Sequence, residues 1–169
     1  MMRDKTNISR KAAFFDRDGT INIDKGYLFK KQDIIFIDET LSVMRELSAK
    51  GYLLFIVTNQ SGIGRGYYTE EDLFELNQWM LDELRMREIQ VEKIYYCPHH
   101  PDAKIPEYKK GCTCRKPRIG LFLEAAKEYN LDLNNCLVFG DKDSDLALGQ
   151  YFNCRCFLLD EDGAFTEKK

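Results

Sequence analysis

The sequence predicts an α/β fold built on a doubly wound, mostly parallel sheet. Short apolar runs without polar alternation predict strands that are buried on both faces. Segments with helical periodicity separate these runs, as in a parallel sheet covered by helices. The chain has 169 residues, of which 44% are hydrophobic and 31% charged. This length and composition predict one soluble domain over residues 1–169.

Two strands and two helices are expected in the first half of the chain. Ala12–Phe15 is wholly apolar and stops at Asp16, which is typical of a buried strand that enters a turn. Thr69 is followed by Asp72 at the capping-box distance, a short-acid version of the box that opens a helix. The expected elements are a strand at 12–15, a helix at 38–50, a strand at 52–57 and a helix at 69–87.

The second half continues the alternation around one irregular stretch at 97–117. The apolar strand at 136–139 again stops at a glycine and an aspartate, Gly140-Asp141. The segment 160–169 is polar and is expected to be a frayed tail. The expected elements are a strand at 91–96, a helix at 119–129, a strand at 136–139, a short helix from about residue 144 and a strand at 155–159.

Charge and apolar patterning exclude several classes of protein. There are 25 Lys and Arg against 28 Asp and Glu, which gives a net charge of −3 and a pI near 5.5. Nucleic-acid binders usually have a basic excess, so that class is disfavoured. The longest aliphatic or aromatic runs are about five residues, too short to cross a membrane. No sustained apolar stretch follows residues 1–11, so no signal peptide is expected. We therefore expect a cytoplasmic protein that binds neither nucleic acid nor a membrane.

Oxygen-bearing side chains follow three of the expected strands. Asp16 and Asp18 follow the first, Thr58 the second and Asp141 the strand at 136–139. The carboxyl ends of parallel strands meet at one edge of the sheet, where ligands bind. Converging carboxylates repel one another unless they share a cation, and Mg²⁺ takes oxygen ligands of this kind. The alternative interpretation of Asp16 and Asp18 is an ordinary Asx turn.

A metal held at this edge usually meets a phosphate as its other ligand. Lys116 and the pair Thr58-Asn59 can supply the positive charge and the donors that such a phosphate needs. No cysteine or serine has a histidine at motif spacing, so an aspartate is the best candidate nucleophile. An aspartate can attack phosphorus to give an acyl phosphate, which water then cleaves.

Cysteine and histidine cluster in the irregular stretch. Cys97, His99, Cys112 and Cys114 offer three thiolates and one imidazole, which is a closed tetrahedral set typical of structural Zn²⁺. The alternative is three buried cysteines and a surface histidine. The other cysteines, at 136, 154 and 156, have no histidine near them in sequence and are expected in the core. A zinc loop over 97–117 would fix where the cations that end it, Arg115 and Lys116, point.

Four motifs occur in order along the chain: Asp16-Arg17-Asp18-Gly19-Thr20, Thr58, Lys116 and Gly140-Asp141-Lys142-Asp143-Ser144-Asp145. Together they resemble the haloacid dehalogenase-like phosphatases. The resemblance implies a Rossmann-like sheet without a separate cap domain, with Asp16 as the nucleophile and Asp18 as the general acid and base. It also implies that Asp16, the backbone carbonyl of Asp18 and Asp141 hold Mg²⁺. Thr58 and Lys116 would orient the phosphoryl oxygens, and Lys142 is expected to be a phosphate or carboxylate partner.

Longer matches narrow the resemblance. They are Phe15 to Asn22, Gly26-Tyr27, Thr58 to Ile63, Tyr95 to Pro101 and Cys112 to Pro117. From about Phe14 to Ser144 the chain resembles the D-glycero-D-manno-heptose 1,7-bisphosphate 7-phosphatases; after Leu148 it departs from their pattern. This implies Mg²⁺ and Zn²⁺ as cofactors and a small sugar phosphate as the partner. The reaction would be removal of the 7-phosphate in nucleotide-heptose synthesis for surface polysaccharide, by a monomer.

The same resemblance implies which residues contact the substrate. Arg115 suits the distal 1-phosphate, because its guanidinium fork can bind a phosphate through two hydrogen bonds. The implied substrate-binding residues are Asp24, Lys25, Gly26, Tyr27, Thr58, Asn59, Gln60, Ser61, Arg115, Lys116 and Lys142.

Three alternatives remain open from the sequence. Histidinol-phosphate phosphatases share the aspartates and the zinc loop, whereas Gly26-Tyr27 and the neighbourhood of His100 favour the heptose enzymes. Polynucleotide 3′-phosphatases resemble the stretch 58–66, but the low pI, the zinc cluster and the absence of a G-x-x-x-x-G-K-[ST] loop disfavour them. A non-catalytic zinc module or a receiver domain would not need the complete set of nucleophile, acid, cation and metal ligands.

Overall fold

Six strands in residues 10–169, the part of the chain that the computed structural model describes, form one sheet in the order β3-β2-β1-β4-β5-β6. The pairs from β3 through β5 are parallel, so the predicted α/β class is confirmed. Residues 1–9, most of the segment expected to lack a signal peptide, lie outside the described residues. The strands are β1 (Ala12–Phe15), β2 (Leu53–Asn59), β3 (Val91–Cys97), β4 (Leu137–Gly140), β5 (Arg155–Leu159) and β6 (Phe165–Lys168).

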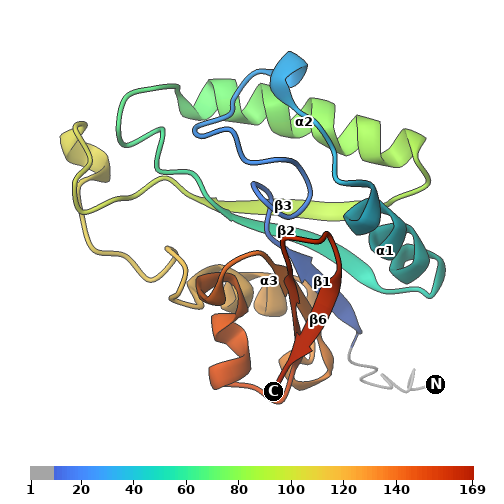
Figure 1. Cartoon of the computed structure of the whole chain (residues 1–169). Helices are drawn as coiled ribbons and strands as arrows, with labels where there is room; N and C mark the ends of the chain where they lie inside the picture. Colours follow the sequence, from blue (N-terminus) through green and yellow to red (C-terminus); the bar gives the residue numbers. More distant parts are fainter. Residues whose placement is uncertain (1–9) are drawn as a thin grey trace, which may run out of the picture.

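Three α-helices cover the two faces of this sheet. Helices α1 (Asp38–Ala49) and α2 (Glu70–Met86) lie on one face and α3 (Gly120–Tyr129) on the other (Figure 1). The capping box predicted for α2 is present, because the Asp72 N–H donates to Thr69 Oγ1 at 3.1 Å and the Thr69 N–H donates to the Asp72 carboxylate at 2.8 Å. Short 3₁₀ helices complete the elements: η1 (Lys31–Asp33), η2 (Pro106–Tyr108), η3 (Leu133–Asn135) and η4 (Asp143–Gln150).

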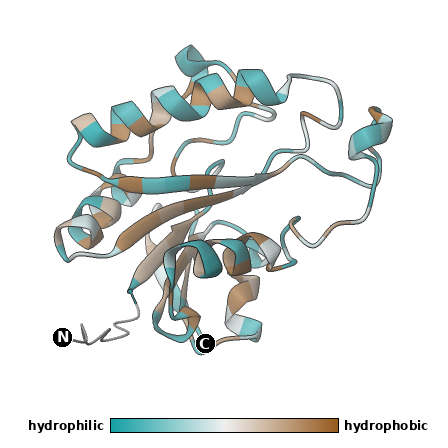
Figure 2. Ribbon diagram, turned by 180° about the vertical axis from the view of Figure 1, so that it is seen from behind, coloured by the Kyte–Doolittle hydropathy of each residue, from teal (hydrophilic) through white to brown (hydrophobic). Residues whose placement is uncertain are grey.

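Neighbouring residues of β1 serve opposite cores. Phe14 packs with Phe55 and Phe122 beneath α3, whereas Phe15 packs with Met44 and other buried residues beneath α1 and α2. Successive strand side chains point to opposite faces, so an uninterrupted apolar strand fills both cores at once. Figure 2 shows mostly hydrophobic strands at the centre of the sheet and helices that carry both hydrophilic and hydrophobic residues. The carboxyl end of β1 is therefore anchored from both sides.

The frayed tail predicted after Asp160 is wrong, because β6 pairs antiparallel with β5 (Figure 1). Asp160 organises the connecting turn by accepting hydrogen bonds from the N–H groups of Asp162 and Ala164, at 3.0 and 2.9 Å. Across the two strands, Arg155 pairs with Glu167 at 2.9 Å. An exposed edge strand is polar along most of its length, so its sequence looks like that of a loose tail.

Within residues 10–169, no helix has the length and apolar character needed to cross a bilayer.

Candidate active site

A cavity of about 440 Å³ opens at the carboxyl ends of the central strands. It brings together Asp16 from β1, Thr58 from β2 and the segment that follows β4, which agrees with the site predicted from the strand ends. Of the residues predicted to bind substrate, Lys25 is exposed and does not line the cavity, whereas the others do. The lining residues are Asp16, Asp18, Asp24, Gly26, Tyr27, Thr58, Asn59, Gln60, Ser61, Gly62, Tyr68, Arg115, Lys116, Lys142, Ser144 and Asp145.

Lys116 joins two carboxylates at the base of this cavity. Its Nζ lies 2.8 Å from Asp16 Oδ1 and 2.7 Å from Asp145 Oδ1, and it donates to the Val57 carbonyl at 2.6 Å. Burial acts to lower the pKa of Lys116, but the attraction of the two carboxylates outweighs it and the pKa is raised. Burial raises the pKa of Asp16 to about 7, against the opposing charge of Lys116. The lysine thus holds a positive charge beside Asp16 where solvent does not reach.

Asp145 is a member of this site that the sequence analysis left without a role. Its Oδ1 pairs with Lys116, and its Oδ2 accepts from the backbone N–H groups of Asp141 and Lys142, at 3.2 and 3.1 Å. A Cβ on Gly140 would lie 2.3 Å from the Asp145 Cβ, so glycine is required where this side chain folds back. The available signal was its position four residues after Asp141 in the last motif.

Three carboxylates in the site can approach one cation. Oxygens of Asp16, Asp141 and Asp145 lie within 4.8 Å of one another. Burial raises the pKa of Asp141, and the Asp145 charge adds to the effect. Gly19, at φ +89°, makes room for Asp141, because a Cβ there would lie 2.3 Å from Asp141 Oδ2. An all-oxygen donor set under mutual repulsion fits a hard divalent ion.

The three carboxylates are not equally free to take that ion. Both oxygens of Asp145 are already engaged, one by Lys116 and the other by two backbone N–H groups. Asp141 Oδ1 accepts one hydrogen bond, from the Thr20 hydroxyl at 3.1 Å. Asp16 and Asp141 are therefore the carboxylates best placed to coordinate, with Asp145 holding Lys116 and the loop.

Asp18 and Thr58 face the cavity beside Asp16. The Asp18 carboxylate accepts hydrogen bonds from Arg17, Asn22 and Gln60, and its side chain is 20% exposed. Gln60 Nε2 also donates to Thr58 Oγ1 at 2.9 Å. The side-chain amide of Gln60 therefore donates hydrogen bonds to both Asp18 and Thr58.

Asn59 holds the backbone of Lys116. Its Nδ2 donates to the Lys116 carbonyl at 3.1 Å, and its Oδ1 accepts from the Lys116 N–H at 3.0 Å. These two bonds clamp the segment 112–117 to the end of β2. Asn59 lines the cavity as predicted, but most of its hydrogen-bonding capacity is directed at Lys116.

The loops at 24–28 and 61–68 line the cavity, and a third loop, at 98–103, contacts the second of them. Asp24 Oδ1 accepts a hydrogen bond from the Gly26 N–H at 2.9 Å. The backbone of Tyr27 has a φ of +48°, and the centroid of its ring lies 4.6 Å from that of the Tyr67 ring. Arg65 stacks over Tyr27 and reaches His100 Nε2 at 3.1 Å, which connects the loops at 24–28, 61–68 and 98–103. The cavity is therefore walled by loops from separate parts of the chain.

Two further cations, Lys142 and Arg115, are less buried than Lys116. Lys142 Nζ lies 3.9 Å from Asp24 Oδ2, and Arg115 Nη1 donates to the His99 carbonyl at 3.4 Å. Both side chains line the cavity. The cavity therefore contains positive charge in addition to that of Lys116.

The cysteine–histidine set converges as predicted. Cys97 Sγ lies 3.6 Å from His99 Nδ1 and from Cys112 Sγ, and His99 Nδ1 lies 3.2 Å from Cys114 Sγ. A tetrahedral zinc ion spaces such ligand atoms by about 3.6–3.8 Å. The Sγ atoms of Cys97 and Cys114, 2.8 Å apart, would separate on binding. Cys97 ends β3, and the other three ligands lie in the segment 98–117 that follows it and that also carries Arg115 and Lys116 (Figure 1).

The thiols of this cluster differ in acidity. Burial acts to raise the pKa of Cys112, but hydrogen bonds from Cys114, Cys97 and the backbone outweigh it and lower the pKa to about 6. Burial raises the pKa of Cys97 and, less strongly, that of Cys114. In the absence of a metal ion, hydrogen bonds from the neighbouring thiols thus stabilise the thiolate of Cys112. The donor set fits a soft divalent ion that would take all of them as thiolates.

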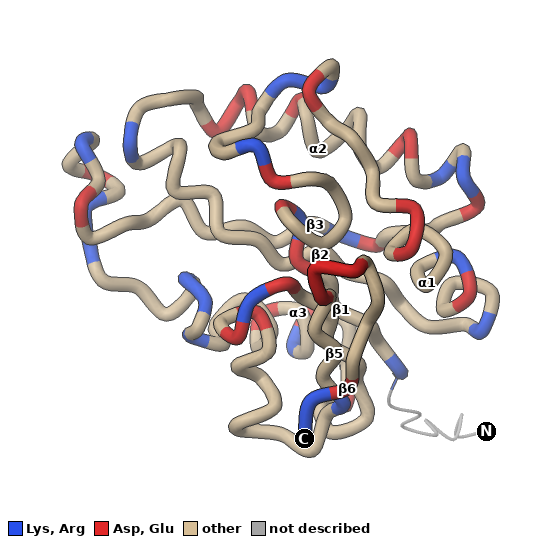
Figure 3. The backbone as a smooth tube through the Cα atoms, viewed as in Figure 1, with Lys and Arg blue, Asp and Glu red and all other residues tan. Residues whose placement is uncertain are grey.

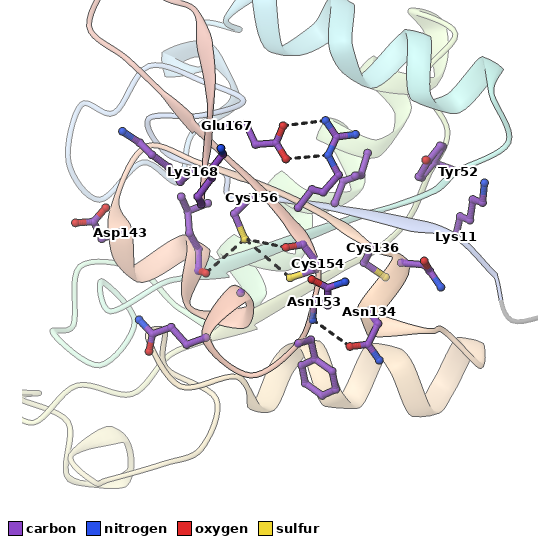
Figure 4. A pocket seen from close by; sticks show the side chains of 18 residues that line it. Lys11, Tyr52, Asn134, Cys136, Asp143, Asn153, Cys154, Cys156, Glu167 and Lys168 are labelled. Atoms are coloured by element: carbon purple, nitrogen blue, oxygen red, sulfur yellow. Dashed lines mark hydrogen bonds and ion pairs between the residues drawn. The ribbon is translucent and has the colours of Figure 1, made fainter.

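The remaining cysteines, at 136, 154 and 156, line a second, larger cavity of about 970 Å³ (Figure 4). Cys136 and Cys156 are buried as predicted, and Cys154 is half-buried. The Sγ atoms of Cys154 and Cys156 are 3.9 Å apart. None of the residues predicted for the site lines this cavity.

Comparison with known proteins agrees with the geometry of the first cavity. The family of polynucleotide kinase 3 phosphatases matches residues 11–146. A D-glycero-beta-D-manno-heptose-1,7-bisphosphate 7-phosphatase of Pasteurella multocida is 47% identical over 141 residues, which cover 83% of this chain and 76% of the relative. The corresponding alpha-heptose enzyme of Campylobacter jejuni is 48% identical over 139 residues, 82% of this chain and 76% of the relative.

The chain belongs to the heptose 1,7-bisphosphate 7-phosphatase family. Solved structures agree with this. The D,D-heptose 1,7-bisphosphate phosphatase of B. bronchiseptica, complexed with magnesium and phosphate, superposes with a TM-score of 0.75 at 30% identity, over 88% of this chain and 79% of that one. A HAD-like protein from Mesorhizobium loti superposes with a TM-score of 0.83 at 32% identity, over 89% of this chain and 72% of that one. Membership of this phosphatase family makes the chain a hydrolase of phosphate esters.

Proposed function

We propose that this member of the family is a Mg²⁺-dependent phosphatase that removes the 7-phosphate from D-glycero-D-manno-heptose 1,7-bisphosphate. One observation carries the proposal: a single cavity holds the buried Asp16–Lys116 pair at its base and the cations Arg115 and Lys142 at its rim. A bisphosphate needs two separate anion sites of this kind. The names of the relatives support the sugar, and the reaction would serve nucleotide-heptose and surface-polysaccharide synthesis.

Asp16 acts as the nucleophile in this proposal. A carboxylate oxygen of Asp16 attacks phosphorus, the new O–P bond forms, and the P–O bond to heptose C7 breaks. Asp18 donates its proton to the departing sugar oxygen, which leaves as an alcohol. Water then attacks the aspartyl phosphate, Asp18 accepts its proton, and inorganic phosphate departs with Asp16 restored as a carboxylate. Lys116 and the Thr58 hydroxyl orient the phosphoryl oxygens and offset their charge.

Asp16, Asp141 and the backbone carbonyl of Asp18 are proposed to hold Mg²⁺, with Asp145 supporting Lys116. The bound ion would neutralise charge on the phosphoryl group and favour the ionised form of Asp16. The magnesium complex of the Bordetella relative supports this choice of ion. Asp145 is left out of the set because its oxygens are engaged by Lys116 and backbone N–H groups.

The distal phosphate is assigned to Arg115 and Lys142. Arg115 follows the cysteine–histidine cluster directly, and its side chain is directed by the same loop that carries Lys116. We propose Zn²⁺ for that cluster, as a structural ion that fixes the two neighbouring cations relative to each other. The loop at 24–28 and the residues at 58–61 would contact the sugar.

A polynucleotide 3′-phosphate is the strongest rival substrate, because the matching family is described by that activity. Charge argues against it. The chain has a net charge of −3, whereas nucleic-acid binders usually have a basic excess. Figure 3 shows basic and acidic residues interspersed along the backbone of residues 10–169. Histidinol phosphate is a monophosphate and has no second phosphate group for Arg115 and Lys142 to bind.

The proposal is tested by phosphate release with Mg²⁺ from both anomers of heptose 1,7-bisphosphate, histidinol phosphate and a 3′-phosphorylated oligonucleotide. Selective release from a heptose substrate is the expected result, and the preferred anomer then assigns the pathway branch, since the relatives include enzymes of both anomers. Preference for histidinol phosphate or the oligonucleotide would overturn the substrate. Arg115→Ala separates the two anion sites, because it should raise KM for the bisphosphate more than for heptose 7-phosphate.

The wider setting is also part of the proposal: a cytoplasmic monomer made of a single domain. Size-exclusion chromatography with light scattering tests the monomer, and limited proteolysis tests the single domain. A dimer, or two stable fragments, would contradict it.

A further inference from the structure

Arg17, the residue between the two catalytic aspartates, is fully buried. Its side chain is 0% exposed, and Arg17 is the largest fully buried side chain of the described core. A charge taken out of water in this way is costly unless it is paired and hydrogen-bonded. Nothing in the nucleophile–acid spacing itself demands an arginine here, so its contacts must explain it.

The guanidinium is paired with the carboxylate of the proposed general acid. Arg17 Nη2 lies 2.8 Å from Asp18 Oδ2 and 3.0 Å from Oδ1, and Nε lies 3.1 Å from each oxygen. The fork therefore addresses both oxygens and fixes the plane of the carboxylate, which a single point charge could not do. The backbone of Arg17 is held as well, because the N–H groups of residues 20, 21 and 22 donate hydrogen bonds to its carbonyl.

Arg17 also reaches a loop of the substrate cavity. Its Nη2 donates to the Leu28 carbonyl at 3.0 Å in a buried contact. Leu28 closes the loop whose residues Asp24, Gly26 and Tyr27 line the cavity. One guanidinium nitrogen thus joins the general acid to the backbone of a substrate loop.

Gln60 makes a parallel connection from the other side. Its Nε2 donates to Asp18 Oδ2 at 3.0 Å, and its Oε1 accepts from the Tyr68 hydroxyl. Tyr68 lies at the end of the loop 61–68, which forms another part of the rim. The Asp18 carboxylate is therefore held by two buried side chains, each anchored in a different loop of the cavity.

The arrangement is not what stability alone would select. Within the described residues, Arg17 Nη1 is a buried nitrogen without a hydrogen-bond partner. Leaving a buried charged donor unpaired is destabilising. Strain and unmet hydrogen bonds of this sort accumulate where a precise orientation matters for function.

We propose that Arg17 is a positioning residue that aims the Asp18 carboxylate at the oxygen of the scissile ester and couples this aim to the loop 24–28. The inference rests on the proposed function of Asp18 as general acid and base. A substrate whose distal part orders the loop then also orders Asp18, so distal binding energy raises kcat as well as lowering KM. A small phosphate ester that does not contact the loop gains nothing from Arg17.

The test compares a poor leaving group with a good one. Arg17→Met fills similar volume without the fork, and Arg17→Lys keeps the charge alone. On heptose 1,7-bisphosphate, whose alkoxide must be protonated, R17M should lower kcat about 100-fold with KM changed less than about threefold. On p-nitrophenyl phosphate, whose leaving group needs no proton, kcat should fall less than about fivefold. R17K should be intermediate. An equal loss on both substrates would show a merely structural role and overturn the proposal.

A double-mutant cycle with Asp18→Asn gives a second readout. In the D18N background, R17M should change kcat on the heptose substrate less than about threefold. If the double variant instead loses the product of the two single losses in kcat, the two residues act independently and the inference is contradicted. Arg85→Met, at an exposed arginine of α2 paired with Asp82, is the matched control for loss of an arginine. It should leave kcat and KM on both substrates unchanged. Melting curves of all variants establish folding.

Should R17M fail to fold, Tyr68→Phe tests the parallel connection without removing a buried charge. It should lower kcat on the heptose substrate several-fold more than on the aryl phosphate, and an equal effect would count against the coupling of Asp18 to the loops. An error in the proposed substrate can be distinguished from an error in this inference. In that case the wild-type enzyme would hydrolyse p-nitrophenyl phosphate but not heptose bisphosphate. The same variants would in that case be compared on whichever alkyl phosphate the wild type cleaves.

Discussion

Two groups of side chains in residues 10–169 could hold a metal ion, and they differ in what keeps their ligand atoms together. In the acidic site, Lys116 sits between Asp16 and Asp145, and strand ends packed on both faces hold the groups in place. The cysteine–histidine cluster lies on a loop, and its ligand atoms face one another without a cation from the protein between them. The acidic site is therefore preorganised by the fold, whereas the loop depends on its ion.

This contrast predicts that the two ions have different roles. An ion in the acidic site takes part in chemistry and contributes little to folding, because strands and helices already fix its ligands. An ion in the loop is expected to contribute folding free energy, because it would hold together four ligands from separate points of the segment 97–114. Changes at the first site should alter turnover, and changes at the second should alter stability.

The largest expected effect is on turnover, at the acidic site. Asp16→Asn removes the nucleophile and should lower kcat at least about a thousandfold. Lys116 keeps Asp145 as a partner, so the melting temperature should stay within about 5 °C of wild type. Phosphate-release kinetics and thermal unfolding measure the two quantities. Activity above a tenth of wild type would contradict the covalent mechanism.

The opposite result is expected at the loop. Cys112→Ser removes one ligand of the proposed zinc ion and should lower the melting temperature by about 10 °C. Elemental analysis of both proteins should show about one zinc in the wild type and markedly less in the variant. Cys136→Ser, at a buried thiol outside the cluster, is the control, because it should leave zinc content unchanged. Zinc-free wild-type protein with an unchanged melting temperature would refute a structural ion.

Proton linkage should distinguish the acidic site further. The metal-free pKa of Asp16 is raised to about 7, mainly by burial, so below pH 7 a cation must displace a proton. The apparent dissociation constant for Mg²⁺ should rise by up to about tenfold for each pH unit below 7 and level off above it. Calorimetric titration between pH 5.5 and 8 measures this. Asp16→Asn lacks that proton and should show a weaker pH dependence; a wild-type constant that does not change below pH 7 would contradict the prediction.

The smallest expected effect is a gain in stability. Without metal, Asp141 faces the like charges of Asp16 and Asp145, and burial with this repulsion raises its pKa. Asp141→Asn should stabilise the metal-free protein at pH 8 by about 1 kcal/mol, while abolishing most of the Mg²⁺-dependent activity. Chemical denaturation without metal tests it. Destabilisation would mean that Asp141 holds the loop as Asp145 does.

Much of the site was predictable because its residues follow strand ends. The apolar runs at 12–15 and 136–139 identify buried parallel strands, and Asp16 and Asp141 come directly after them. Cys97, His99, Cys112 and Cys114 were predictable from ligand type alone. The edge strand β6 was not, because three of its four residues are exposed and its sequence carries little apolar signal.

The roles of Arg17 and Asp145 were also beyond the sequence. Each is one charged residue among many in a polar motif, and spacing does not show whether a charged side chain turns to solvent or into the core. Arg17 is buried because the loop 24–28 covers it, and Asp145 because η4 turns back toward β1. Such burial depends on contacts between distant segments.

The sequence by itself determined the parallel sheet, the acidic strand ends, the soft-ligand loop and the family to which they belong. These features are local: a run of apolar residues decides burial, and the residue type that ends the run decides the chemistry. Only the tertiary structure decided that Lys116 pairs with Asp16 and Asp145, and that Arg17 ties Asp18 to a substrate loop. The order of strands places β1 between β2 and β4, and that adjacency brings side chains 100 residues apart into contact.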